Sequence, residues 1–172
     1  MTEASSPSAK RTDEGITLTR LFDAPRDLVF AAWKDPELMM RWWGPRDFTT
    51  PVCEIDFRVG GTWFSCMRSP EGQDYCSVCI YREIVEPERI VYMDSFADTE
   101  GNVVSASYYG LSPEWPLESK VTVTFDQVDG KTRLTVNNVG VPQNQDADDA
   151  MAGWNESMDR LEQVLRQRVM QR

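Results

Sequence analysis

Apolar and polar residues alternate along much of the chain, and this pattern predicts β-strands. The segments that alternate, or that lie between turn signals, are residues 16–22, 53–59, 62–68, 75–85, 89–96, 121–125 and 132–139. A period of two places apolar side chains on one face of a strand and polar side chains on the other. Turns rich in glycine, proline or acidic residues separate most consecutive segments, so we expect neighbouring strands to pair antiparallel.

The remaining patterned segments predict three helices. Two short helices follow the first strand, at residues 27–33 and 36–43, and a long helix ends the chain after a cap at Asn144 or Asp146. Spacings of three and four give this long helix one apolar face, made by Met151, Trp154, Met158, Leu161 and Leu165.

These elements have one economical way to bury their apolar faces. An amphipathic helix and a sheet with one apolar face pack against each other, and strand twist makes the sheet curl around the helix. We therefore predict an α+β fold in which a curved antiparallel sheet wraps around the long C-terminal helix. One helix does not fill a curved sheet, so we also expect a space between them.

The chain is predicted to form one domain with two tails. We expect residues 1–14 to be a disordered polar tail, residues 15–168 to form the domain and residues 169–172 to be a C-terminal tail. The start of the chain does not resemble a signal peptide, and no segment approaches the roughly 20 apolar residues of a membrane span. We therefore expect a cytoplasmic protein without membrane insertion, whose four cysteines are reduced thiols.

Two of the cysteines, Cys76 and Cys79, have the C-x-x-C spacing that redox and zinc sites share. They lie in a β-type segment, where residues three apart point to opposite faces of the sheet. We therefore interpret them as small buried apolar residues, with a redox or zinc site as the alternative.

Composition narrows the possible functions. The 172 residues are 41% hydrophobic and carry 18 basic against 28 acidic side chains, a formal net charge of −10. Nucleic-acid binding needs a cationic surface, so we expect no nucleic-acid partner. The sequence contains no histidine. This excludes Ser–His and Cys–His catalysis and histidine-ligated metals. We predict neither a metal site nor a cofactor.

Two aromatic segments are candidates for shaping a binding site. Residues 97–118 form a long loop with three aromatic residues, and loops of this length in a compact domain are often functional. Residues 42–45, Trp-Trp-Gly-Pro, lie at the end of the second predicted helix. We expect them to close one end of the fold, with an entrance gate as the alternative.

The order of elements and several collinear segments resemble a known family. The segments are DAPRDLVFAAWKDPELMMRWWGP at residues 23–45, EIDFRVGGTW at 54–63, YREIVEPERIVY at 81–92, VTVTFDQVDGKTRLTV at 121–136 and AGWNESMDRLEQVL at 152–165. From about residue 16 to about residue 166, the chain is similar to the activator-of-heat-shock-protein-90-ATPase-homologue-like proteins of the START-like (SRPBCC) superfamily. The resemblance implies a helix-grip fold with a deep apolar cavity under the C-terminal helix.

Carried onto this sequence, the resemblance implies ligand-binding residues on three elements. The helix would contribute Met151, Trp154 and Met158, and the long loop Tyr108 and Trp115. The sheet-side candidates are Phe57, Trp63, Tyr81, Tyr92 and Phe96. The pattern leaves open which residues of the segments 62–68 and 75–85 point inward, and each aromatic residue could instead be ordinary core.

Three functions remain open at this level. The first is binding of a hydrophobic or amphipathic small molecule, as a carrier or sensor, by a monomer or homodimer. The second is a cyclase- or hydrolase-like enzyme that uses a cavity carboxylate, Glu83 or Asp94, with Tyr81 or Tyr92. For Glu83 an exposed pair with Arg82 or Arg89 is the alternative. The third is co-regulation of the heat-shock-protein-90 ATPase, which the family name suggests.

Overall fold

The computed structural model describes residues 8–171 as a single antiparallel sheet, three helices and one short 3-10 turn. The strands are β1 (Ser8–Arg11), β2 (Gly15–Phe22), β3 (Thr49–Ile55), β4 (Thr62–Arg68), β5 (Asp74–Val85), β6 (Arg89–Ala97), β7 (Ser119–Val128) and β8 (Lys131–Val139). The helices are α1 (Arg26–Lys34), α2 (Pro36–Trp42) and α3 (Gln145–Met170), and the 3-10 turn is η2 (Ala106–Tyr109). The strand order across the sheet is β1-β2-β8-β7-β6-β5-β4-β3.

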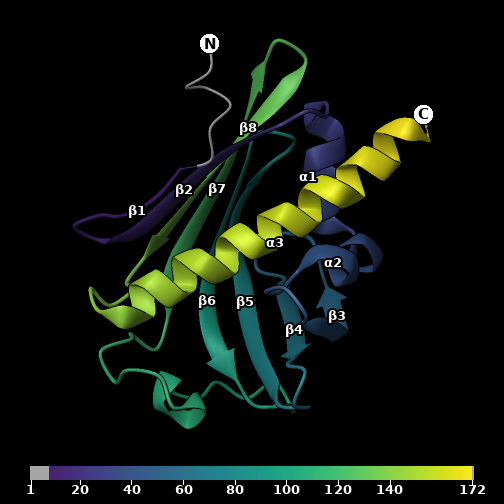
Figure 1. Ribbon diagram of the computed structural model, residues 1–172. Helices are drawn as coiled ribbons and strands as arrows, with labels where there is room; N and C mark the ends of the chain where they lie inside the picture. Colours follow the sequence, from purple (N-terminus) through teal and green to yellow (C-terminus); the bar gives the residue numbers. More distant parts are fainter. Residues whose placement is uncertain (1–7, 172) are drawn as a thin grey trace.

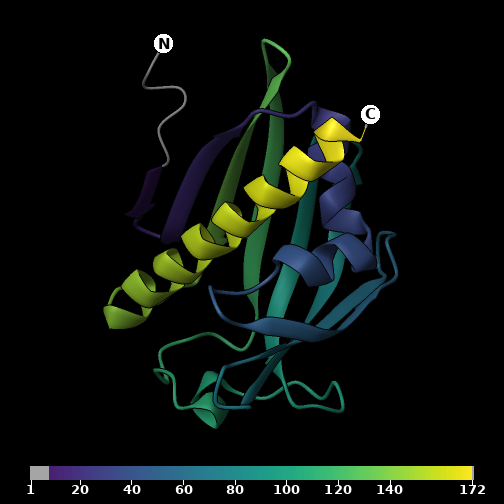
Figure 2. The ribbon, with the colours of Figure 1, turned by 45° about the vertical axis from the view of Figure 1, so that its right-hand side comes forward.

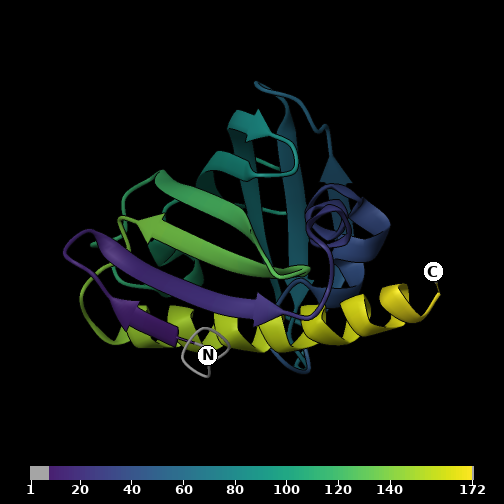
Figure 3. The ribbon, with the colours of Figure 1, turned by 90° about the horizontal axis from the view of Figure 1, so that it is seen from above.

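The sheet curves around α3, which crosses its concave side (Figure 1). Turning the molecule shows α1 and α2 beside the C-terminal half of α3, while the loop that carries η2 lies toward the other end (Figure 2). The view from above shows α3 running along the open side of the curved sheet (Figure 3). This arrangement confirms the predicted α+β fold.

Capping at its start and packing along its length define α3. The side chain of Asn144 accepts a hydrogen bond from the Asp146 N–H at 2.8 Å, so Asn144 is the cap. Asp146 and Asp148 in the first turn oppose the positive end of the helix dipole. Its buried residues are Ala147, Ser157, Met158, Leu161, Val164 and Leu165. Leu161 thus lies in the core, as expected.

The predicted tails are structured in part. Ser8–Arg11, expected to be disordered, forms β1 and pairs with Leu18 and its neighbours in β2. The Arg11 guanidinium also reaches α3, where it donates to the Asn144 carbonyl at 2.9 Å and pairs with Asp148 at 3.1 Å. Residues 1–7 of the predicted tail lie outside the described residues. At the other end, α3 continues to Met170, two residues into the predicted C-terminal tail.

The strand expected at residues 53–59 lies earlier in the chain. β3 covers Thr49–Ile55, and residues 56–61 form the connection to β4. The Asp56 N–H donates to the Thr62 carbonyl at 2.8 Å, and the Gly61 N–H donates to the Arg58 carbonyl at 2.8 Å. These bonds turn the chain before Phe57 can enter the sheet. The apolar Phe57 and Val59, which gave the strand pattern, therefore lie in a turn.

The core fills the space between the sheet, α1, α2 and the C-terminal half of α3. Trp33 and Trp42 are fully buried there, with ring centres 5.0 Å apart. Phe125 lies 6.2 Å from Trp33, which confirms its expected core position. Trp42 thus closes this end of the fold, as predicted, whereas the next three residues of the Trp-Trp-Gly-Pro segment line a cavity.

The prediction of four reduced cysteines is wrong. Cys66 and Cys76 stand directly opposite each other in the register of β4 and β5 and form a disulfide. Their sulfurs lie on the convex side with Ala97, in a small second core. Cys79 is on the concave face and is a free, buried thiol, as the three-residue spacing in a strand requires. The C-x-x-C residues are therefore not partners of each other.

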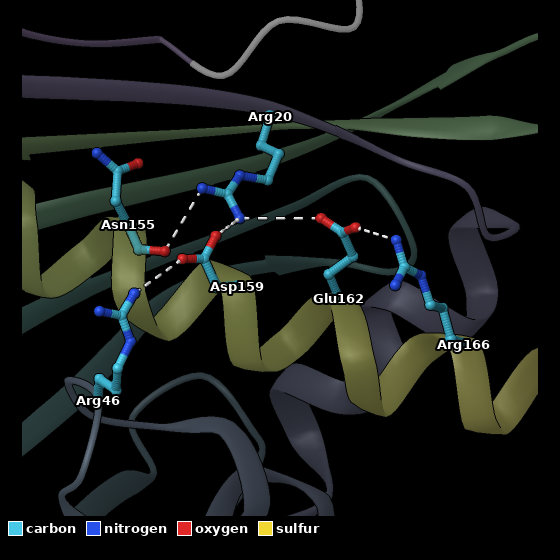
Figure 4. Close-up of polar contacts among 6 residues, drawn as sticks. All are labelled: Arg20, Arg46, Asn155, Asp159, Glu162 and Arg166. Atoms are coloured by element: carbon cyan, nitrogen blue, oxygen red, sulfur yellow. Dashed lines mark hydrogen bonds and ion pairs between the residues drawn. The ribbon is translucent and has the colours of Figure 1, made fainter.

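A buried arginine on β2 is held by acidic side chains of α3 (Figure 4). The Arg20 side chain is 9% exposed, and its guanidinium lies 2.6 Å from the Asp159 carboxylate and 4.0 Å from Glu162. It also donates to the Asn155 carbonyl at 3.4 Å. Asp159 in turn lies 3.7 Å from the exposed Arg46. Asp159 is thus the main partner of a charge that water barely reaches.

We expect the variant Asp159→Ala to lower the free energy of unfolding by about 2 kcal/mol, because it leaves the buried Arg20 guanidinium poorly paired. The matched control is Arg46→Ala, which removes an exposed partner of the same carboxylate and should cost about 0.5 kcal/mol or less. Urea unfolding followed by circular dichroism measures both values. Equal losses in the free energy of unfolding for the two variants would show that burial of Arg20 does not strengthen its pairing with Asp159.

Candidate functional site

A cavity of about 300 Å³ lies between the sheet and the N-terminal half of α3. Its floor is made by side chains of the concave face, Met67, Asp94, Phe96, Ser119 and Asn138. Its roof is α3, with Asp146, Asp149, Ala150, Gly153, Trp154 and Ser157. The segment after α2 and the long loop complete the wall with Trp43, Gly44, Pro45, Leu111, Trp115 and Pro116. The cavity is therefore mostly apolar, with a few polar groups.

The wall after α2 is fixed to the roof by hydrogen bonds. Arg160 on α3 donates to the carbonyls of Trp43, Gly44 and Pro45 at 3.0–3.2 Å. The Gly44 N–H donates to Ser157 Oγ at 3.1 Å. Gly44 has a φ of 105°, a left-handed conformation that favours glycine. These contacts hold the Trp43 ring against the cavity.

The Trp154 ring forms the centre of the roof. It is half-buried, stacks on Trp33 with ring centres 6.2 Å apart, and meets Trp43 edge to face at 5.3 Å. Trp154 therefore belongs to the core on one side and to the cavity on the other. The two alternatives for Trp154, core residue and cavity lining, therefore both apply.

The long loop is tied to the sheet at one point and to α3 at another. The Tyr109 hydroxyl accepts from the Cys76 N–H at 3.0 Å and donates to the Ala97 carbonyl at the ends of β5 and β6. Asp146 Oδ2 accepts from Trp115 Nε1 at 2.8 Å and from the Ser112 N–H at 2.9 Å. Asp146 thus holds the rim of the cavity closed against the helix.

The variant Trp115→Phe should loosen this rim without unfolding the domain. It removes the donor to Asp146 but keeps an aromatic ring, so we expect local opening to become easier by about 1 kcal/mol, or about fivefold. Hydrogen-exchange mass spectrometry should show faster exchange in residues 110–118. Tyr108→Phe, which changes an exposed hydroxyl on the same loop, is the control and should change nothing. Unaltered exchange in Trp115→Phe would mean that the bond does not hold the loop.

Asp94 is the carboxylate on the floor. It lies on the concave face of β6 between Tyr92 and Phe96, opposite Cys79 in β5. The Cys79 thiol lies 3.3 Å from Asp94 Oδ1 and donates to it. Burial raises the pKa of Asp94 to about 6, although the hydrogen bonds from Cys79 and the Ser95 N–H act in the opposite direction. Burial also keeps the pKa of the Cys79 thiol well above its usual value, so it remains a donor.

The predicted site residues fall into two groups. Phe96, Trp115 and Trp154 line the cavity. The other predicted residues do not, which corrects their expected placement: Trp63, Tyr81, Tyr92 and Met158 are buried core, and Met151 and Phe57 pack at its edge. Tyr108 is 60% exposed on the loop. Phe57 lies against Phe30 and Tyr81 in the turn that replaced the expected strand.

The structure also settles the open strand parity. The odd-numbered residues Trp63 and Tyr81 point to the concave side, but α1, α2 and the Trp43 ring cover this part of the sheet. They therefore become core rather than cavity lining. Inward direction alone was not enough to predict contact with the cavity.

Several lining residues were missing from the predicted ligand-binding set. Asp94 was considered only as an enzymatic carboxylate, and Ser119, Asn138 and Asp149 were not considered. The alternation in the sequence could have indicated two of these residues. Asn138 continues the inward alternation of Leu134 and Val136, and Asp94 continues that of Tyr92, so each is a polar residue at an apolar position.

The arrangement required by the enzyme hypothesis is present only in part. Asp94 lines the cavity, but Glu83 is exposed and accepts from Arg89 at 2.6 Å, and this pair lowers the pKa of Glu83. Tyr81 and Tyr92 are buried outside the cavity lining. Among residues 8–171 no group of three histidine, cysteine or acidic side chains is placed to hold a metal ion. Within the same residues, no helix is both long and apolar enough to span a membrane.

Comparison with known proteins places the chain in a family. Residues 23–166 match the family described as "Activator of Hsp90 ATPase homolog 1-like protein". The chain belongs to this family. This confirms the resemblance seen in the sequence. No curated protein matches the chain.

Solved structures of bacterial proteins share the fold over nearly the whole chain. A solution structure from Arthrobacter aurescens is 26% identical, with 93% of this chain and 91% of that chain covered and a TM-score of 0.76. A crystal structure from Chromobacterium violaceum is also 26% identical, with 90% and 98% covered and a TM-score of 0.75. The AHSA1 protein of Silicibacter pomeroyi is 22% identical, with 88% and 97% covered and a TM-score of 0.70. The helix-grip fold is thus that of this Activator of Hsp90 ATPase homolog 1-like family.

Proposed function

We propose that this family member binds a hydrophobic or amphipathic small molecule in the cavity under α3, as a carrier or sensor. The observation that carries the proposal is the cavity itself, about 300 Å³ in volume and lined mainly by apolar side chains. The cavity opens to solvent, so a small molecule can enter it. The volume is at the lower end of the range of about 300–1,000 Å³ found for small-molecule sites.

The types of side chain that form the cavity wall support the same function. Trp43, Trp115, Trp154 and Phe96 offer rigid apolar surface, and Met67 offers a side chain that adapts to irregular shapes. The loop that forms the rim is fixed through the Asp146 contacts, which can break and reform without changing the core. A ligand can therefore be enclosed and released by the movement of one loop.

The test combines an unbiased measurement with a directed one. Native mass spectrometry of freshly purified protein, followed by solvent extraction, should show any bound compound as excess mass. In parallel, the lipophilic fluorescent probe N-phenyl-1-naphthylamine should bind and accept energy from the tryptophans of the cavity. The variant Ala150→Phe fills the roof and should weaken probe binding at least about tenfold, since a displaced apolar group costs about 1.4 kcal/mol or more.

The control is Ala152→Phe, two residues further on the same helix but exposed. It adds the same ring outside the cavity and should leave probe binding unchanged. Equal probe binding by the wild type and both variants would place the probe elsewhere and contradict the proposal. Absence of both excess mass and probe binding would also contradict it.

The structure gives less support to the other two functions, catalysis and co-regulation of a chaperone. Asp94 supplies a cavity carboxylate for an enzyme, but no tyrosine stands beside it in the cavity lining of the described residues. Co-regulation of Hsp90 is suggested by the family description alone. It stays a prediction that a pull-down with the chaperone tests.

A further inference from the structure

The charged side chains that line the cavity are all acidic among the described residues. Asp94 on the floor and Asp146 and Asp149 on the roof are carboxylates, and within the described part of the chain no lysine or arginine lines the cavity. Arg160 lies on the roof helix, but its guanidinium donates to the backbone carbonyls of residues 41, 43, 44 and 45. The site is therefore unsuited to a ligand whose polar group is an anion, such as a fatty acid.

Two of the polar groups lack a full set of partners inside the protein. Asp94 receives the Cys79 thiol and the Ser95 N–H but forms no ion pair among the described residues. Asn138 is 7% exposed, lines the same floor, and its Oδ1 has no hydrogen-bond partner in the described protein. Asp94 is only partly buried, so it stays accessible to a ligand in the cavity. A buried amide such as that of Asn138 is normally paired, because leaving it unpaired costs stability. A ligand that donates hydrogen bonds would supply what is missing.

The aromatic lining favours a cation over a neutral donor. Trp43 and Trp154 meet edge to face at 5.3 Å and 88°, and Phe96 and Trp115 do so at 5.5 Å and 87°. All four rings line the cavity, and a cation within about 6 Å of the face of an aromatic ring is attracted by the ring quadrupole. A cation near these faces is also attracted by the carboxylates of the same cavity.

We propose that the cavity is selective for an amphipathic amine, a molecule with an apolar body and a protonated nitrogen that pairs with Asp94 beside the aromatic rings. This inference rests on the proposed function, because it names the class of small molecule that the cavity takes. The apolar body would lie along Trp154, Phe96 and Trp115, and the nitrogen would donate to Asp94.

Three probes with the same apolar body test this selectivity. They are 4-phenylbutylamine, a cation at pH 7.5, 4-phenyl-1-butanol, which is neutral, and 4-phenylbutyrate, an anion. Each is titrated in 0.15 M salt, where exposed charges are screened beyond about 8 Å, with displacement of N-phenyl-1-naphthylamine as the readout. We expect the amine to bind at least about tenfold more tightly than the alcohol, and the anion to bind most weakly.

The variant Asp94→Asn keeps the shape and the acceptor for Cys79 but removes the charge. It should reduce amine affinity to about that of the alcohol, a loss of about tenfold, while alcohol affinity stays within about twofold. Glu71→Gln removes the same charge from the exposed turn between β4 and β5 and is the matched control. Glu71→Gln should change none of the three affinities, although it changes the net charge of the chain by the same amount as Asp94→Asn.

The outcomes separate this inference from the function on which it rests. Equal affinities for the three probes, or tighter binding of 4-phenylbutyrate, overturn the amine selectivity and leave small-molecule binding intact. An amine preference that survives in Asp94→Asn also overturns the assigned pairing. Failure of all three probes to displace N-phenyl-1-naphthylamine, combined with unchanged probe binding by Ala150→Phe, overturns the proposed function itself.

Discussion

Replacement of Trp154 by alanine should lower the free energy of unfolding by about 2–3 kcal/mol, less than the 3–5 kcal/mol typical of a fully buried tryptophan. One face of this ring packs on Trp33 and Trp43, so its removal loses real contacts. Part of the ring also lines the cavity, and that part has no protein neighbour to lose. Urea unfolding followed by circular dichroism measures the loss.

The same change should alter the binding of N-phenyl-1-naphthylamine by about tenfold or more, because a large part of the cavity roof disappears. Trp33→Ala is the comparison, since Trp33 is 2% exposed and does not line the cavity. It should cost about 3–5 kcal/mol. A Trp154 variant as unstable as the Trp33 variant, with normal probe binding, would show that Trp154 is core alone.

The position of the cavity follows from side-chain volume along α3. The C-terminal half of the helix packs against α1 and α2, where Trp33 and Trp42 fill the space. The N-terminal half carries Ala150 and Gly153 and faces Ser119 and Asn138 across the fold. The small side chains at Ala150, Gly153 and Ser119 leave room where no short helix intervenes. The cavity is thus at one end of α3 rather than along its whole apolar face.

This explains what the sequence could predict and what it could not. Periodicity predicted most of the strands, the long helix and their curved packing, because these depend on local alternation and on one apolar face. The family resemblance, carried onto this pattern, implied that Trp154, Phe96 and Trp115 would line the cavity, and they do. The same inference wrongly placed Met158 and Tyr92 in the cavity lining. The pattern predicts the side of the sheet or helix on which a side chain lies, but not which neighbouring residues cover it.

The disulfide and the first strand depend on long-range pairing. Cys66 meets Cys76 because of the register between β4 and β5, which the pattern of either segment alone does not contain. Ser8–Arg11 is polar and becomes a strand only because the edge of β2 offers hydrogen bonds and α3 offers partners for Arg11. Such features are properties of the assembled fold.

The variant Asp94→Asn should be more stable than the wild type at pH 7.5, by about 2–3 kcal/mol in the absence of added amine. Burial raises the pKa of Asp94 to about 6 from an ordinary value of 3.8, so the folded protein holds this proton more tightly than the unfolded chain. Wild-type stability therefore decreases as pH rises from about 4 to about 6, and the loss persists above that range. The asparagine variant lacks this loss.

Urea unfolding at pH 4.5 and pH 7.5 tests the prediction, because the two proteins should differ much less at the lower pH. The control is Glu83→Gln, whose carboxylate has a lowered pKa through Arg89 and should give no gain in stability at pH 7.5. A gain for Asp94→Asn that is independent of pH, or no gain at all, would show that the carboxylate is not destabilised by burial. A carboxylate that costs stability in this position is expected where its charge serves binding. An amine should then offset this cost in the wild type and stabilise it more at pH 7.5 than at pH 4.5.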